Sequence, residues 1–264
     1  MNVGERLRDF FKPKNRPVPP DPLTQSINEI TDTVREAERM KRTFGRYVTP
    51  QVADAILAGD VKLGGEQKHV TAVFIASSNI DAATQGMNPV DKTTLLNKYY
   101  PHVLEPFIVS QGTVDRLEPE EGGAKIIFNS PVSLEDHEAR AVTAAVAFQE
   151  GMAEFNQQRK AAGEEPILEF TVGIDTGKVV AGNIGSDKRT EYTVVGEPVG
   201  NAKDIALTTR SAEKGVFISE ATYYPAKDVI IPGATEESSV LTRHCPVTVF
   251  EVKEIYKPKP RRKN

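Results

Sequence analysis

The sequence predicts an α+β fold in which helices pack against a mainly antiparallel sheet. Two observations predict it. Long stretches with apolar residues at helical spacing alternate with short apolar runs typical of strands, and some neighbouring runs are separated only by turn residues, as in hairpins. Hydrophobic residues make up 39% of the 264 residues, which is enough for a core surrounded by solvated tails.

The expected elements follow in chain order from apolar spacing, caps and turn residues. A buried strand is expected at residues 69–75, followed by a helix opened by Pro89 at 89–111 and a hairpin of two strands at 113–118 and 124–128. A second long helix is expected at 134–162, followed by a strand at 167–174 and a strand pair within 178–195. A helix at 198–212 and late strands at 216–218, 239–241 and 247–253 complete the chain. The order β-α-β-β-α-β is the ferredoxin-like pattern, here with helices expected on one face of the sheet and extra strands at the C-terminal end.

The ends of the chain differ in composition from this core. Residues 1–12 mix apolar and basic side chains, which suits either a disordered tail or a short amphipathic helix that docks on an anionic membrane surface or in the groove of a signalling partner. Residues 13–23 contain five prolines and predict an extended linker. Residues 24–43 predict a helix that either packs on its own domain or forms a parallel coiled coil between two chains. Residues 255–264 are basic and expected to be disordered.

Charge and cysteine content exclude several classes of protein. The formal charge of −4 predicts no nucleic-acid partner. A single cysteine, Cys245, forms no internal disulfide, which fits a reducing cytoplasm. The four histidines are scattered, and no Cys/His group has metal-ligand spacing. No apolar run approaches the roughly 20 residues of a membrane span, so any membrane contact is expected to be peripheral, at the inner surface.

The most informative segment runs from Gly177 to Glu197 and reads GKVVAGNIGSDKRTEYTVVGE. It closely resembles the corresponding segment of class III adenylate and guanylate cyclase catalytic domains. Residues 44–57, which read FGRYVTPQVADAIL, are similar to the segment that leads into the same domain. The resemblance covers residues 44–254 and implies the ferredoxin-like fold, with active sites that lie between the two subunits of a dimer.

The metal-binding positions of that family are altered. In class III cyclases two aspartates hold two metal ions, which bind the triphosphate and activate the ribose hydroxyl. The first follows a strand of the type V-T-x-x-F-x-D, and here VTAVFIA ends on Ala76, whose methyl group cannot coordinate a cation. The second aspartate position lies in the turn of the hairpin. It falls on Glu120 when counted forward from Gly112 and on Gly122 when counted back from Phe128. The acidic turn suits either a metal site or a solvated loop.

The groups that act on the ribose and the transferring phosphate are altered as well. The family pattern V-N-x-A-x-R reads VGNAKD, so Gly200 replaces the asparagine and Asp204 reverses the charge of the arginine. Asn201 is one residue out of register, which turns it by about 100° around a helix. Because a guanidinium is suited to stabilising a transferring phosphoryl group, the resemblance implies that no catalytic residue remains in place.

A few charged residues are candidate contacts for a nucleotide or another small ligand. The resemblance places Arg116 at the substrate-selecting lysine and Glu197 at an acidic base-selecting position, and the turn of Asp187, Lys188 and Arg189 supplies further charges. Glu197 equally suits a cap for the helix that follows it, and the others equally suit solvated surface charges.

These observations predict a catalytically degenerate cyclase homology domain that acts as a homodimeric signalling, regulatory or ligand-binding module without a cofactor. The alternative is a divergent but active cyclase that converts ATP or GTP to a cyclic nucleotide and pyrophosphate. It would hold Mg²⁺ or Mn²⁺ with Asp81, Glu120 and Glu121. A third possibility is a scaffold whose cleft is filled, since fold alone does not choose among these.

Overall fold

The computed structural model divides into two compact units, Met1–Val48 and Thr49–Asn264. It describes residues 64–256 apart from 187–188, 213, 232–234 and 243–245, and in the first unit residues 23, 27, 30–35 and 37–39. The expectations for residues 1–12, for most of the linker, for residues 44–57 and for most of the tail lie outside these residues.

The first unit contains helical residues where the sequence predicts a helix. Residues 30–35 and 37–39 are helical, and Thr31 Oγ1 donates to the Ile27 carbonyl one turn earlier, at 2.7 Å. Ile27, Ile30 and Val34, which form the apolar seam, are each more than half exposed.

The second unit is built on an eight-stranded sheet with the order β2-β3-β1-β4-β6-β8-β7, in which β5 pairs with β4 alone. The strands are β1 (Gly64–Ser77), β2 (Thr113–Glu118), β3 (Gly123–Phe128), β4 (Phe170–Ser186), β5 (Arg189–Val195), β6 (Gly215–Ser219), β7 (Thr235–Leu241) and β8 (Pro246–Val252). Among the described strands, β4 and β6 alone pair in parallel, and the other pairings are antiparallel. This arrangement confirms the predicted α+β class.

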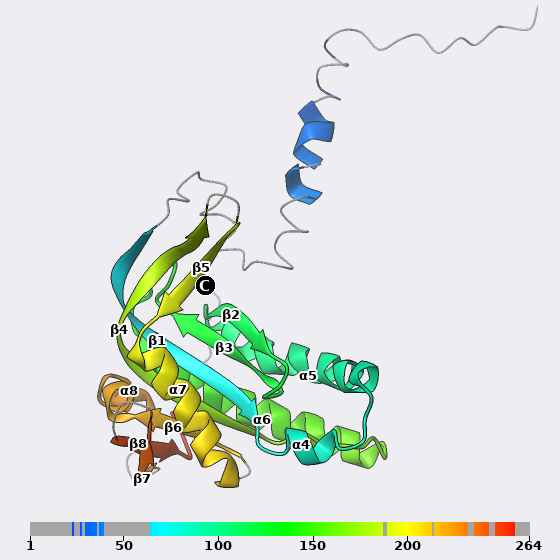
Figure 1. The fold of residues 1–264 in the computed structure, drawn as a ribbon, viewed down its shortest axis with the longest axis vertical. Helices are drawn as coiled ribbons and strands as arrows, with labels where there is room; N and C mark the ends of the chain where they lie inside the picture. Colours follow the sequence, from blue (N-terminus) through cyan, green and yellow to red (C-terminus); the bar gives the residue numbers. More distant parts are fainter. Residues whose placement is uncertain are drawn as a thin grey trace, which may run out of the picture. The chain divides into compact units, whose positions relative to one another are not determined.

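Helices cover both faces of the sheet (Figure 1). The helices are α4 (Ile80–Ala83), α5 (Pro89–Val109), α6 (His137–Ala161), α7 (Glu197–Thr208) and α8 (Glu220–Ala226). On one face α5 and α6 pack on alternate residues of β1, including Val73 and Ile75. On the other face α7 packs on the intervening ones, including Phe74 and Ala76. The expectation of helices on one face was wrong because β1 is apolar on both sides.

The buried face of the long helix α5 follows the helical spacing of its apolar residues. The buried residues of α5 are Leu95, Leu96, Tyr99, Val103 and Phe107, the five that the spacing selects. The helix begins after Asn88, whose side chain accepts a hydrogen bond from the Asp91 amide, and has Pro89 at its first position. Sequence patterns did not predict the short helices α4 and α8, and they divided the 17-residue strand β4 into two.

Candidate functional site

The end of β1 and the turn between β2 and β3 lie side by side. The strands pair with Ile75 opposite Ala124, and the Ser77 amide donates to the Glu121 carbonyl at 2.7 Å. At Gly123 a Cβ atom would come 1.8 Å from the Ile75 carbonyl oxygen, so only glycine permits this approach. The end of β1 and this turn correspond to the two metal-binding positions of class III cyclases, and the two positions are thus adjacent.

At this place the structure brings together a methyl group and an ion pair. Ala76 is fully buried among apolar residues beneath α7. Lys203, on α7, reaches the turn, where its Nζ lies 2.7 Å from Glu121 Oε1. The two side chains are only 28% and 20% exposed. The Lys203 ammonium also lies 5.0 Å from the centre of the Phe74 ring, a cation–π contact.

Electrostatics keep this carboxylate ionised. Burial alone would raise the pKa of Glu121, but the hydrogen bond and charge of Lys203, aided by the charge of Arg210, outweigh it and hold the pKa below its usual range. Glu121 therefore remains negative and already has a cation as its partner. Sequence reasoning passed over Lys203, although its position four residues after Val199 places it beside the helix face that packs on the sheet.

A polar pocket of about 470 Å³ opens at the N-terminal end of α7. Asn201 Nδ2 donates to Asp175 Oδ2 at 2.9 Å, and Ser219 Oγ donates to the other carboxylate oxygen of Asp175. Asn201 Oδ1 is buried and has no hydrogen-bond partner among the described residues. Three carboxylates, those of Asp175, Glu197 and Glu220, line the pocket beside one lysine, Lys178. This surplus of negative charge disfavours a triphosphate and favours ligand groups that donate hydrogen bonds.

A chain of buried hydroxyl groups connects this pocket to the opposite face of the sheet. Each group lies within hydrogen-bonding distance of the next, and the order is Asp175, Ser219, Thr222, Thr176, Thr71 and finally His137 Nδ1. The three separations nearest the histidine are 2.9, 2.9 and 2.7 Å. Every residue in this series is buried and hydrogen-bonded to the next. The hydrogen-bond network is therefore a rigid link between the start of α6 and the start of α7.

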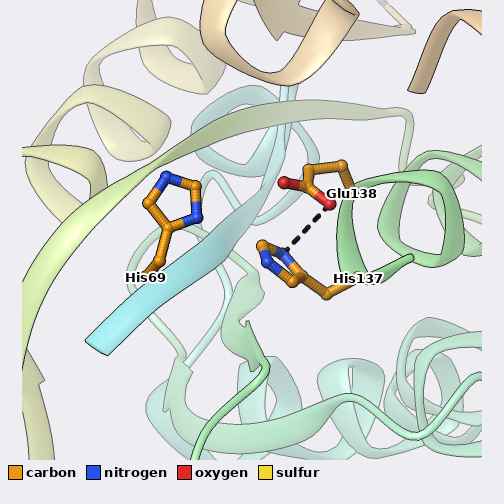
Figure 2. Close-up of side chains that lie close together, drawn as sticks. All are labelled: His69, His137 and Glu138. Atoms are coloured by element: carbon orange, nitrogen blue, oxygen red, sulfur yellow. Dashed lines mark ion pairs between the residues drawn. The ribbon is translucent and has the colours of Figure 1, made fainter. Parts of the chain in front are cut away.

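His137 marks the far end of that chain and lies close to two other potential metal ligands (Figure 2). One ligand atom from each of His69, His137 and Glu138 lies within 4.8 Å of the others. Burial and the neighbouring His69 lower the pKa of His137, while Glu138 and Asp136 oppose this shift. The histidines are scattered along the sequence, and their spacing alone does not predict this group. Only the fold brings them together.

The residues expected to bind metal or ligand are distributed unevenly. Asp81 and Glu120 are exposed. Among the described residues, the group of His69, His137 and Glu138 is the one set of three or more His, Cys, Asp or Glu side chains close enough to share an ion. Arg116 pairs with Glu191 at 3.1 Å on the surface. Asp187 and Lys188 lie outside the described residues, as does the side chain of Arg189.

The altered positions on α7 differ in their surroundings. At Gly200 a Cβ atom would meet nothing within 4 Å, so a larger residue would fit there. Asp204 is partly buried. Glu197 opens the helix after Gly196, and its side chain is exposed at the mouth of the pocket.

Among the described residues, no helix is long and apolar enough to cross a membrane.

Comparison with known proteins identifies the family. The profile of the adenylate and guanylate cyclase catalytic domain matches residues 65–244. The uncharacterized protein Rv1318c of Mycobacterium tuberculosis is 34% identical over 190 residues, which is 72% of this chain but only 33% of that protein, so the chain spans about a third of this relative.

Solved structures agree with this assignment. The guanylyl cyclase Cya2 is 30% identical with a TM-score of 0.63, and the adenylyl cyclase CyaB from P. aeruginosa is 25% identical with a TM-score of 0.62. Each comparison covers 75% of this chain and 98% of the other. The chain belongs to the class III adenylate and guanylate cyclase catalytic-domain family.

Proposed function

We propose that this chain is a catalytically silent class III cyclase domain that acts as a dimeric regulatory or ligand-binding module. The observation that carries the proposal is the ion pair between Lys203 and Glu121, beside Ala76. Lys203 is already bound to Glu121 and competes with a metal ion for that carboxylate. Ala76 offers no ligand atom with which a metal could compensate.

The second support comes from α7. Gly200 has no side chain with which to hold a ribose, and Asp204 repels a triphosphate instead of stabilising its charge. Removing one electrostatic group of this kind typically slows an enzyme by about 100-fold or more. Asn201, the residue that follows Gly200, is hydrogen-bonded to Asp175. Metal binding and transition-state stabilisation are therefore weakened independently.

Other parts of the chain have features suited to association and binding. The apolar side chains of Ile27, Ile30 and Val34 are exposed along one helix and suit a parallel coiled coil with a second copy. The pocket beside Asp175 has room for a small molecule, and the amide oxygen of Asn201 in it has no hydrogen-bond partner among the residues that the structure describes. These features favour a homodimer that binds a small hydrogen-bond donor over an inert scaffold.

Calorimetric titration of the full chain with ATP and GTP, each with and without Mn²⁺, tests the proposal. We expect that Mn²⁺ does not enhance the binding of either nucleotide, because the metal-binding carboxylates are missing or paired. Metal-dependent binding that is lost in Glu121→Gln would contradict the proposal and favour the alternative of a divergent, active cyclase. Sedimentation of Ile30→Glu beside the unaltered chain tests the dimer, which the added charge should dissociate.

A further inference from the structure

We propose that His69, His137 and Glu138 form a binding site for one divalent transition-metal ion of the zinc type. The three residues come from two elements, since His69 lies on β1 and the other two open α6. Figure 2 shows all three side chains gathered in one place. An ion held here would tie the outer part of β1 to the start of α6.

The ligand chemistry favours a zinc-type ion. Imidazole nitrogens suit Zn²⁺, Co²⁺ and Ni²⁺, whereas Mg²⁺ prefers an all-oxygen shell. Two histidines and one glutamate, with a water molecule in the fourth position, form a recognised coordination set for zinc. The site therefore differs in chemistry and in place from the position of Ala76 and Glu121, which lies on the α7 side of the sheet.

The geometry requires only a small adjustment. Bonds of about 2.0–2.1 Å in a tetrahedral shell place ligand atoms roughly 3.3 Å apart. The ligand atoms here lie within 4.8 Å of one another. Side-chain rotations that move these atoms by about 1.5 Å close the remaining gap. His69 is exposed, so its side chain can turn toward the other two ligands and the ion has a route from solvent.

The surroundings hold the central ligand in place. His137 is only 7% exposed, and its Nδ1 lies 2.7 Å from Thr71 Oγ1, a contact that fixes the plane of the ring. Metal-binding histidines are oriented in this way through the ring nitrogen that does not bind the metal, so with Nδ1 held by Thr71 the metal-binding nitrogen of His137 is Nε2. Thr71 is the first hydroxyl of the buried chain that ends at Asp175. Metal binding at His137 therefore acts on the same rigid network that supports the pocket.

The test is titration of metal-free full-length protein with Zn²⁺ by calorimetry and with Co²⁺ by visible absorption. We expect one equivalent of Zn²⁺ to bind, and Co²⁺ to give the intense visible bands of a four-coordinate site. His69→Asn and Glu138→Gln should each weaken binding by about 10-fold or more. His69 is exposed, so its variant is expected to fold even if a change at buried His137 is not tolerated.

Two control variants make the result specific. His102→Asn removes an exposed histidine that stacks on Phe155, away from the site, and should bind Zn²⁺ as the unaltered chain does. Glu121→Gln should also leave Zn²⁺ binding unchanged, which separates this site from the altered catalytic position. Binding that persists in both His69→Asn and Glu138→Gln, or the absence of a stoichiometric site in the unaltered chain, would overturn the proposal.

Discussion

The ion pair between Lys203 and Glu121 predicts a measurable coupling energy. At 2.7 Å, with side chains 28% and 20% exposed, the pair lies between a surface ion pair, worth about 0–1 kcal/mol, and a buried charged hydrogen bond, worth about 1.5–3 kcal/mol. We therefore expect a coupling of about 1–2 kcal/mol from a double-mutant cycle of Lys203→Met and Glu121→Gln, measured by urea unfolding at pH 7. Methionine keeps the apolar contact with Phe74.

The pH dependence of this coupling follows from the pKa of Glu121, which is lowered in the folded protein. A carboxyl group with a lowered folded pKa stabilises the fold above its unfolded pKa, and this contribution disappears as the pH falls through the folded pKa. The coupling should thus be full at neutral pH and vanish in acid. The exposed pair of Arg116 and Glu191, whose side chains are 55% and 56% exposed, serves as the control and should couple by less than about 1 kcal/mol. A cycle that shows no more coupling for Lys203 and Glu121 than for this control would refute the reasoning.

Two further pairs of variants test the packing of the second unit. Tyr99→Phe should cost about 1–3 kcal/mol in unfolding free energy, because the buried Tyr99 hydroxyl bonds both Asn156 and the Leu168 amide. Tyr100→Phe should cost almost nothing, because the Tyr100 hydroxyl has no hydrogen-bond partner among the described residues. Burial, and after it the charge of Glu118, raises the pKa of Tyr100 to about 12. Equal losses for the two would contradict this. Gly173→Ala should destabilise by more than about 1 kcal/mol, since its Cβ would lie 2.2 Å from the Ala202 carbonyl oxygen of α7. Gly151→Ala in α6 meets nothing within 4 Å and should stabilise by about 0.5–1 kcal/mol, so thermal melting of both variants should show opposite shifts.

The parts of this fold that sequence predicted well are those decided by local periodicity. The apolar face of α5, from Leu95 to Phe107, follows directly from spacing of three and four residues, and the hairpin follows from its turn residues. The class III resemblance added the family and the positions of Ala76, Gly200 and Asp204, because those substitutions are visible without coordinates.

The contacts within the candidate site could not be predicted because they join distant parts of the chain. Lys203 meets Glu121 across 82 positions, and Thr71 meets His137 across 66. Both contacts depend on which face of β1 each helix covers, a property set by strand register and not by local spacing. One signal was present: His69 and Thr71 alternate along β1 and so share the face on which α6 packs.

The most direct test of a silent cyclase domain is an assay of cyclic nucleotide formation. The full chain at high concentration, supplied with ATP or GTP and either Mg²⁺ or Mn²⁺, is expected to form no cyclic AMP or cyclic GMP above a protein-free control. Formation of either product that depends on metal and is abolished by Glu121→Gln would contradict the account and establish an active site built around that carboxylate.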